Sequence, residues 1–478
     1  MIAGALYTFS EETLRMTIMF PPLYPTESKR AQVQVLDSSG APRAWRNCNI
    51  KDHSWHCRVR VRDLSMTQSY TYRIMYKPNT NDGSLVYTLR GSIPRQQGFP
   101  KVATVGCFGQ DQTKNKQKLV DAIRAQDPDL IVLQGDQTYF HDDLLYGFFE
   151  TIYSLRNLLK DFPTIVQMDD QDYGTANLWG AENDDEVSGA GFAKPPCIIN
   201  ILQDLAMGHN PYPARPATLQ NGITIHYSNY IYGSVDFAFI EARKFKNWSP
   251  QGTILGASQE EWLENYCDDN SKIKVILSQT PFSNVVTNYV GAQGVRSNAA
   301  GVTAKDSNGY PVSGRESFMS ILQNCGRTAA TILSGDVHVA LSVSYDDYGV
   351  MECTSPAAIN HIFWRLSFLE KNVPLQDSFG NNLRLLDVYN VDQNVIDTFR
   401  TPFRTRAASD ETKHLRGDGF LIFTLDESSR TCAAHGYRTG PQHIYWETSM
   451  PFDSIPPPPP TNPPASAPPN GAPPGYSL

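Results

Sequence analysis

The sequence predicts an α/β protein whose core follows a small β domain and precedes a proline-rich tail. Near the N-terminus, segments that alternate apolar with polar side chains are separated by turn clusters, as antiparallel strands are. These segments are residues 30–36, 54–61 and 69–76. From residue 100, short apolar runs alternate with helical stretches, which is the pattern of βαβ units. From Pro451 to the end, 12 of 28 residues are proline.

We therefore divide the 478 residues into three parts. These are a fibronectin-like β-sandwich at 1–97, the α/β main domain at 98–447 and a disordered tail at 448–478. A chain so rich in proline cannot pack a core, so the tail is expected to be an extended linker or end. Binding of the tail to a proline-reading partner is the minority interpretation.

The core begins with a β-α-β-α-β pattern. The apolar runs are residues 102–105, 130–133 and 164–168, and the helical stretches lie around 119–123 and 142–160. The runs end near Cys107, Asp136 and Asp170, which are 29 and 34 residues apart. Because a βαβ unit takes about 30 residues, these steps predict consecutive parallel strands.

Further elements follow with a weaker pattern. Strands are predicted at 223–232, 235–240, 274–277 and 331–333. A helix at 258–266 is expected to begin with a capping box between Ser258 and Glu261. The segments 181–222, 284–318 and 360–415 have the composition of loops. In an enzyme such insertions often shape the pocket.

The formal charge of −8 is unevenly distributed. Residues 1–99 hold 13 Lys/Arg and 7 Asp/Glu, a net +6, so the rest carries −14. An acidic main domain argues against specific nucleic-acid binding, because phosphate backbones need a basic face. The acid excess serves either solubility or a set of carboxylates around cations. No run of about 18 apolar residues exists, so no membrane span is expected.

Cysteine usage and the N-terminus leave the compartment open. Eight cysteines in this length are too few for a disulfide scaffold, although Cys48 and Cys57 could pair across a hairpin. The absence of a C-x-x-C pair argues against a zinc ribbon. No basic region followed by an apolar block is visible at the start, so we identify no signal peptide.

The polar residues that end the apolar runs are of types that bind metal ions. Besides Cys107, Asp136 and Asp169-Asp170, a later run is followed by Gly335-Asp336-Val337-His338. Sites in open α/β sheets form at the carboxyl ends of strands, so these residues are expected to converge. Asp336 and His338 alternate on an extended segment and can point the same way. Thiolate, carboxylate and imidazole together suit a cation cluster.

Asp136 also begins a D-x-x-Y spacing that ends at Tyr139. A phenolate suits a hard ferric ion, and a carboxylate can bridge two metals. Each motif alone is weak, because an Asp after a strand is more often a helix cap and a lone Cys is more often a small buried hydrophobe. A lone His is likewise more often structural. A metal site is favoured because four such elements occur in order, each at the end of a predicted strand. They are Cys107, Asp136, Asp169-Asp170, and Asp336 with His338.

The ordered motifs resemble the PhoD-like metallophosphatases, the alkaline phosphatase D family, which is related to purple acid and calcineurin-like phosphatases. The motifs are G-C at 106–107, G-D-x-x-Y at 135–139, D-D-x-D at 169–172 and G-D-x-H at 335–338. Similar residues continue at 177–180 (Asn-Leu-Trp-Gly), at 241–243 (Glu-Ala-Arg) and at 255–263. The resemblance covers nearly the whole chain except the tail.

The resemblance implies a four-layer α/β/β/α core and hydrolysis of phosphate monoesters or diesters by a metal-activated hydroxide. It implies two or more metal ions, Fe³⁺ with Ca²⁺ first and Zn²⁺ or Mn²⁺ as alternatives, and no organic cofactor. The implied metal ligands are Cys107, Asp136, Tyr139, Asp170, Asp336 and His338, with Asp136 bridging. Arg243 is implied to face the substrate phosphate, with Asn177 and Gln171 as further catalytic positions.

Gln171 departs from the family pattern, which has histidine there. An amide cannot deliver a proton at neutral pH, and general acid catalysis is worth about 10²–10⁴-fold. Gln171 therefore predicts slow turnover, a good leaving group or another proton donor. The replacements we consider are His141, His209 and His226. Glu241 replaces the usual Asp before Arg243, but it keeps the charge.

We thus expect a metal-dependent phosphoesterase that acts on small-molecule phosphate esters. The alternative is a catalytically impaired descendant that binds metal and acts as a binding protein, because of Gln171. A hydrolase of another ester that uses the same metals is a third hypothesis. The resemblance implies an extracellular or periplasmic location, for which this N-terminus offers no support.

Overall fold

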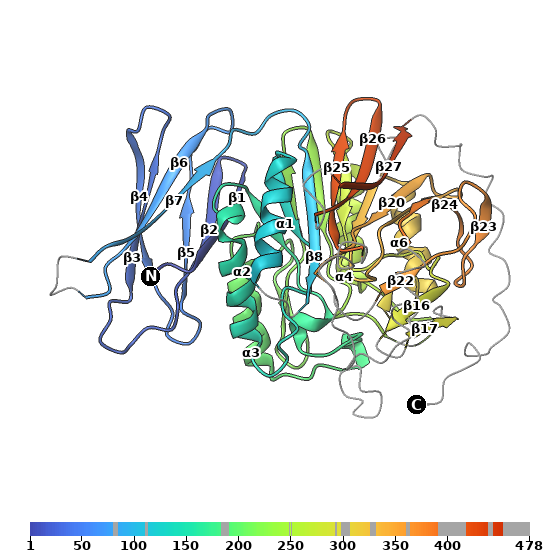
Figure 1. Ribbon diagram of the computed structural model, residues 1–478, viewed down its shortest axis with the longest axis horizontal. Coiled ribbons are helices and arrows are strands. Elements are labelled where there is room, and N and C mark those ends of the chain that lie inside the picture. Colours follow the sequence, from blue (N-terminus) through green and yellow to red (C-terminus); the bar gives the residue numbers. More distant parts are fainter. Residues whose placement is uncertain are drawn as a thin grey trace.

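The structure is a computed structural model. It describes residues 1–79, 85–109, 113–182, 191–247, 249, 251–291, 294–297, 306–325, 331–359, 364–390, 417–437 and 443–452. The fold is mixed α/β, with several sheets and few helices (Figure 1).

The N-terminal part consists of two antiparallel sheets. The first has the strand order β1 (Gly4–Ser10), β2 (Thr13–Met19), β5 (His56–Val61). The second has the order β4 (Pro42–Asn49), β3 (Arg30–Leu36), β6 (Tyr70–Tyr76), β7 (Tyr87–Ile93). Both sheets contribute to one buried apolar cluster that includes Phe9, Val33 and Tyr72. The disulfide between Cys48 and Cys57 joins β4 to β5 and so links the sheets. The expected cysteine pair is formed, but between two sheets rather than across a hairpin. The fibronectin-like assignment stays a prediction.

The first core sheet carries the β-α-β-α-β pattern seen in the sequence. Its order is β10 (Thr164–Val166), β9 (Leu130–Leu133), β8 (Val102–Phe108), β25 (Gly419–Leu425), β26 (Ser429–Gly436), β27 (His443–Pro451), and β21 (Ala357–Ile359) also pairs with β8. Strands β8, β9 and β10 are parallel. Helices α1 (Thr113–Ala125) and α2 (Leu144–Leu159) connect them. The carboxyl ends of these three strands therefore lie at one edge.

The second core sheet brings a fourth strand end to the same region. Its order is β13 (Ser228–Tyr232), β14 (Val235–Phe239), β15 (Ile273–Leu277), β18 (Thr331–Ser334), β20 (Val350–Thr354), β19 (Leu341–Tyr345), β24 (Asn382–Val388), β23 (Pro374–Gln376). Strands β14, β15, β18 and β20 are parallel. The loop after β18 holds the Gly-Asp-Val-His sequence of residues 335–338.

Two apolar clusters bury the core sheets. Helices α1, α2 and α3 (Pro196–Met207) share one cluster with strands of both sheets, for example through Ile123, Val132 and Leu277. Helices α4 (Ala257–Asp268) and α6 (Val312–Gln323) share the other with the second sheet, for example through Phe318 and Ile276. Figure 1 shows α1, α2 and α3 between the N-terminal strands and β8.

Two disulfides and two small sheets complete the core. The disulfide Cys353–Cys432 joins β20 to β26. The disulfide Cys267–Cys325 joins α4 to the second residue after the end of α6. The small sheets are β11 (Ala217–Thr218) with β12 (Thr224–Ile225), and β17 (Gly294–Ser297), β16 (Asn288–Gly291), β22 (Trp364–Leu366). Short 3₁₀ turns occupy Asp170–Tyr173 and Gly180–Glu182. Within the described residues no helix is both long and apolar enough to cross a membrane.

Several sequence expectations need correction. Helix α4 is capped by Gly256 without a side-chain bond, so the capping box of Ser258 and Glu261 is wrong, because both residues lie inside the first turns of the helix. The segments expected to be loops contain α3, the first part of α6, and the strands β11, β16, β17, β22, β23 and β24. Most of these strands have only two to four residues, which is too short for a visible alternation. Strand β27 runs to Pro451, so residues 448–451 are strand rather than tail. The tail from residue 453 lies outside the described residues.

Candidate metal centre

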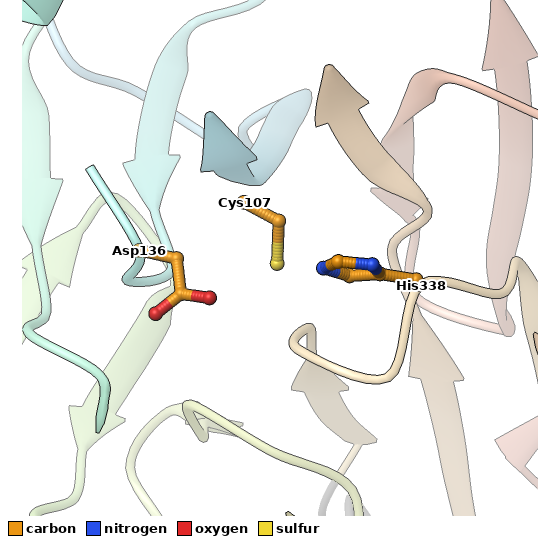
Figure 2. A group of neighbouring side chains, drawn as sticks. All are labelled: Cys107, Asp136 and His338. Carbon is orange, nitrogen blue, oxygen red and sulfur yellow. The ribbon is translucent and has the colours of Figure 1, made fainter. Parts of the chain in front are cut away.

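Four chain segments that follow parallel strands bring metal-ligating side chains together. The ligand atoms of Cys107, Asp136 and His338 lie within 4.8 Å of one another. Figure 2 shows the Cys107 sulfur between the Asp136 carboxylate and the His338 imidazole. A second group also lies within 4.8 Å, and its members are Asp136, Asp169, Asp170 and Asp336. Asp136 belongs to both groups, so it is the residue placed to bridge two ions.

Tyr139 completes the first group. Its hydroxyl donates to Asp136 Oδ2 at 2.7 Å and lies 3.2 Å from His338 Nε2. Tyr139 and His338 are only partly buried, while Asp136 is 1% exposed. All six predicted metal ligands therefore lie in one centre. Asp169, which the sequence named only as a neighbour of Asp170, joins them.

The backbone at these ligands is unusual. Cys107, Asp136, Asp336 and His338 have φ values of 57°, 55°, 68° and 52°. Side chains other than glycine reach this left-handed region at a cost of about 1–3 kcal/mol each, and such residues cluster at functional sites. Gly135 has φ of 107°, and a Cβ there would lie 2.3 Å from Asp169 Cβ. Only glycine therefore lets the two ligand loops approach.

Asp172 ties two of these loops together through backbone donors. Its carboxylate accepts from Asp136 N at 2.8 Å, Asp169 N at 3.0 Å and Thr138 N at 3.2 Å. Buried backbone N–H groups need such partners. Asp172 thus fixes the position of the loops after β9 and β10 rather than offering ligand atoms itself.

Arg243 lies beneath the carboxylates. It is 0% exposed, pairs with Asp169, and donates from Nη2 to Asp336 Oδ2 at 2.8 Å. It also approaches Asp306 Oδ1 at 3.4 Å. The expectation that Arg243 faces a substrate phosphate does not match this position, because the buried carboxylates compete for its guanidinium. Its described contacts neutralise and orient the acids.

The centre holds more negative charge than its arginine balances. Burial raises the pKa of Asp169 to about 7 and of Asp170 to about 6, even though Arg243 lowers both. Burial, followed by the repulsion of neighbouring carboxylates, raises the pKa of Asp136 and of Cys107 well above their usual values. Buried charges need partners. A donor set of carboxylates, a thiol, a phenol and an imidazole therefore fits two or more metal cations.

Gln171 and Asn177 border the centre. The Gln171 amide nitrogen of the backbone donates to Asp136 Oδ1 at 3.2 Å, and the Asn177 backbone N donates to Asp170 Oδ2. The side-chain oxygen of Gln171 lies 2.7 Å from His141 Nε2. Of the three histidines considered as replacement proton donors, His141 is thus the one that contacts Gln171.

The other two histidines lie elsewhere in the fold. His209 Nε2 lies 3.0 Å from Thr164 O, and His226 Nε2 lies 2.9 Å from Pro211 O. Burial lowers the pKa of His209 to about 3 and of His226 to about 4, so both are neutral at physiological pH. They are structural acceptors or donors and do not supply protons to the centre.

Residues that no sequence motif marked complete the surroundings. Asp306 lies between Arg243 and Arg365, and against the effect of burial the two arginines lower its pKa. Lys246 is 0% exposed, donates to Ser307 O at 2.8 Å, and burial lowers its pKa to about 7. Asp306 and Arg365 come from segments expected to be loops, and Lys246 comes from a stretch for which no element was predicted. Asp172 alone had a signal, as the last letter of D-D-x-D.

The motif segments 177–180 and 255–263 contact the backbone at and near Arg243. Gly180 N donates to Arg243 O at 2.8 Å, and a Cβ at Gly180 would lie 2.7 Å from Lys244 Cα. The side chain of Gln259 holds the backbone of Glu241, with both bonds at 2.8 Å. Gly180 and Gln259 therefore help to fix the backbone position of Arg243.

Comparisons with known proteins find the same fold in solved structures. Among solved structures, one described as PhoD is 14% identical, has a TM-score of 0.64, and the match covers 94% of this chain and 90% of that one. Purple acid phosphatase PPD1 from yellow lupin (Lupinus luteus) seeds is 11% identical with a TM-score of 0.58, over 94% of this chain and 73% of that one. No curated protein sequence matches the chain significantly.

The chain therefore shares its fold with the PhoD and purple acid phosphatase structures. More specifically, the model of the PhoD-like phosphatase family matches residues 145–368, so the resemblance seen in the sequence is confirmed. This range contains Asp170, Arg243, Asp336 and His338. Cys107, Asp136 and Tyr139 precede it and are placed by the structure.

Proposed function

We propose that this protein is a metal-dependent phosphoesterase that hydrolyses small phosphate esters. The single observation that carries the proposal is the pair of ligand groups that share Asp136. The PhoD-like family match and the likeness to a purple acid phosphatase structure support it. Whether monoesters or diesters are preferred is a question for the assay below.

In this proposal Cys107, Asp136, Tyr139 and His338 hold one ion, and Asp136, Asp170 and Asp336 hold another. We propose Fe³⁺ for the first, because thiolate and phenolate oxygen suit it, and Ca²⁺ for the second, with Zn²⁺ or Mn²⁺ as alternatives. When bound, such ions supply Lewis acidity to a phosphoryl oxygen and lower the pKa of water.

The chain's own residues have distinct roles. Asp172 holds the loops of Asp136 and Asp169 in register. Arg243 orients Asp169 and Asp336 and partly offsets the rise of their pKa values that burial causes. Gln171 lies at the partly exposed rim beside Asn177, where it can donate a hydrogen bond to substrate but cannot protonate a leaving group. His141, whose Nε2 lies 2.7 Å from the side-chain oxygen of Gln171, is the imidazole that we propose for that task.

The test is spectroscopic and kinetic. Protein purified with its native metals should show a visible band from charge transfer between Tyr139 and iron, together with hydrolysis of nitrophenyl monoesters or diesters. Tyr139→Phe should remove the band and reduce kcat, while the exposed Tyr153→Phe serves as the control. The proposal fails if Tyr139→Phe changes neither the spectrum nor the activity.

The alternative is a metal-binding descendant with impaired catalysis, which the Gln171 side chain favours. It predicts metal binding without hydrolysis of any nitrophenyl ester in Fe, Ca, Mn or Zn, and recovery of hydrolysis in Gln171→His. Measurable turnover of the unaltered protein would exclude it.

Three finer points belong to the same proposal. We infer an α/β/β/α layering, supported by the shared apolar clusters, and an N-terminal sandwich, supported by the apolar cluster that its two sheets share. We also infer an extracellular or periplasmic location, since three disulfides form most readily in oxidising compartments. A partner for the proline-rich tail is inferred from composition only.

A further inference from the structure

Two arginines face each other on the N-terminal sheet, and neither forms an ion pair with a carboxylate of the described residues. Arg15 in β2 lies directly opposite Arg60 in β5 in the antiparallel register. Like charges directly opposed across strands are destabilising. Burial and then Arg60 lower the pKa of Arg15. A sheet that serves only packing has no reason to keep this pair.

Neither guanidinium finds a carboxylate among the described residues. Arg15 is 9% exposed, yet its Nε and Nη1 are buried without a hydrogen-bond partner, as is Arg60 Nε. No ion pair of the described chain includes either residue. Buried unsatisfied charged donors cost free energy, which an acceptor from outside would recover.

An exposed aromatic ring lies over both arginines. The Tyr212 ring centroid is 5.7 Å from Arg15 Cζ and 5.0 Å from Arg60 Cζ, and Arg60 Nη1 donates to Tyr212 Oη at 3.4 Å. Tyr212 is 58% exposed. It belongs to the segment after α3, so the arrangement spans the junction between the N-terminal sheet and the core.

A cavity of about 270 Å³ adjoins this arrangement. Its lining includes Arg58, Asn200, Gln203, Asp204, Tyr212 and His226. Ligand pockets for drug-sized molecules measure about 300–1,000 Å³, so this one suits a smaller ligand. It contains none of the residues of the metal centre.

The arginine pair and the charged groups beside it leave an excess of cations, of which Arg58 lines the cavity itself. Asp204 is the carboxylate that lines it, and it already pairs with Lys51, His56 and Arg58. Glu11 is the other carboxylate that acts on Arg15. The cations are Arg15, Lys51, Arg58 and Arg60. Four cations against two carboxylates match a dianion, and guanidinium groups bind phosphate with paired hydrogen bonds.

We propose that Arg15, Arg58, Arg60 and Tyr212 form a second anion site, at the junction of the N-terminal sheet and the core, that binds inorganic phosphate or a small phosphate monoester. The site is separate from the metal centre and does not depend on the proposed hydrolysis. Tyr212 covers the guanidiniums and closes one side, and the cavity leaves room for one small substituent.

Calorimetric titration of the metal-loaded protein with inorganic phosphate, and separately with glycerol phosphate, tests the site. Arg60→Gln should weaken phosphate binding at one class of site at least tenfold, and Tyr212→Leu should weaken it severalfold. Arg30→Gln, an equal charge change at an exposed position of β3, should leave it unchanged. Asp336→Asn in the metal centre should retain the second site.

Stability provides an independent readout, because removal of one like charge should leave Arg60→Gln at least as stable as the unaltered protein without phosphate. Tighter binding of glycerol phosphate than of phosphate identifies an ester as the ligand, and the reverse identifies the free ion. The proposal is overturned if Arg60→Gln binds phosphate normally, if Arg30→Gln loses as much, or if succinate binds as tightly as phosphate.

Discussion

At the scale of single residues, the centre depends on side chains whose local backbone is unfavourable. Four of the ligands have positive φ, and hydrogen bonds between the end of β8 and the loop after β9 hold two of them, Cys107 and Asp136. Phe108 N, for example, donates to Asp136 O at 2.8 Å, and Cys107 N donates to Gly135 O at 3.2 Å. The free energy stored in these conformations is offset by packing elsewhere in the core.

Asp172 is predicted to control metal affinity although it is not a ligand. Asp172→Asn replaces one acceptor oxygen with an amide that repels backbone N–H groups, so the loops of Asp136 and Asp169 should shift. Partners of this kind are worth about 10–100-fold in metal affinity. Competition with a chelator measures the metal affinity of the variant, and Asp121→Asn at an exposed position is the control. Equal affinities of the two variants would contradict the assignment.

Gln171 is predicted to limit the leaving group. Gln171→His should raise kcat at least tenfold for alkyl phosphates, because general acid catalysis is worth about 10²–10⁴-fold, and should change nitrophenyl substrates little. The ratio of kcat for the two substrate classes is the measurement, and Gln171→Asn is the control. An equal change for both classes would mean that no proton donor is lacking.

At the scale of elements, parallel strands do most of the positioning. β8, β9 and β10 in one sheet and β18 in the other end at the centre, and α1 and α2 set the spacing between the first three. The two sheets are held together by their shared apolar cluster and by Cys353–Cys432. A centre assembled from both sheets therefore requires that they stay in place.

The disulfide between Cys353 and Cys432 is predicted to stabilise this junction. Its closed loop spans 79 residues, and such cross-links typically contribute about 2–4 kcal/mol. Replacement of both cysteines by alanine should lower the free energy of unfolding by about that amount in denaturant titrations. The same change at the exposed free Cys197 should have little effect. Identical midpoints for the two variants would show that packing alone fixes the sheets.

At the scale of the whole molecule, positive charge is concentrated in the N-terminal part and negative charge in the rest of the chain. The N-terminal part carries the net +6 expected from the sequence, and its uncompensated arginines lie at the junction with the core. The acidic remainder gathers buried carboxylates at the metal centre. Both features favour binding over stability, as functional sites do.

Metal affinity is predicted to rise with pH. Burial raises the pKa of Asp170 to about 6 and of Asp169 to about 7, above the usual 3.8. The metal-free folded protein therefore holds these protons more tightly than the unfolded chain, and it loses stability as pH rises from about 4 to 7. Metal ions must displace the same protons, so affinity should rise from pH 5 to 8, by about tenfold per pH unit for each proton.

Titration calorimetry in two buffers of different ionisation enthalpy counts the protons released on metal binding. At least one proton is expected at pH 6 and fewer at pH 8. Affinity that does not change between pH 5 and 8 would show that the carboxylates are already ionised in the metal-free protein.

The parallel strands, the candidate metal ligands after them and the resemblance to PhoD-like phosphatases were predictable from the sequence alone. These follow from local order, because an apolar run followed by a ligand is visible in one stretch of chain. The tertiary structure decided that Arg243 lies beneath the carboxylates, that His141 meets Gln171, and that Asp306 and Arg365 join the centre. It also placed Arg15 opposite Arg60. Such contacts join residues from separate elements, and only the packing of those elements sets the distances between them.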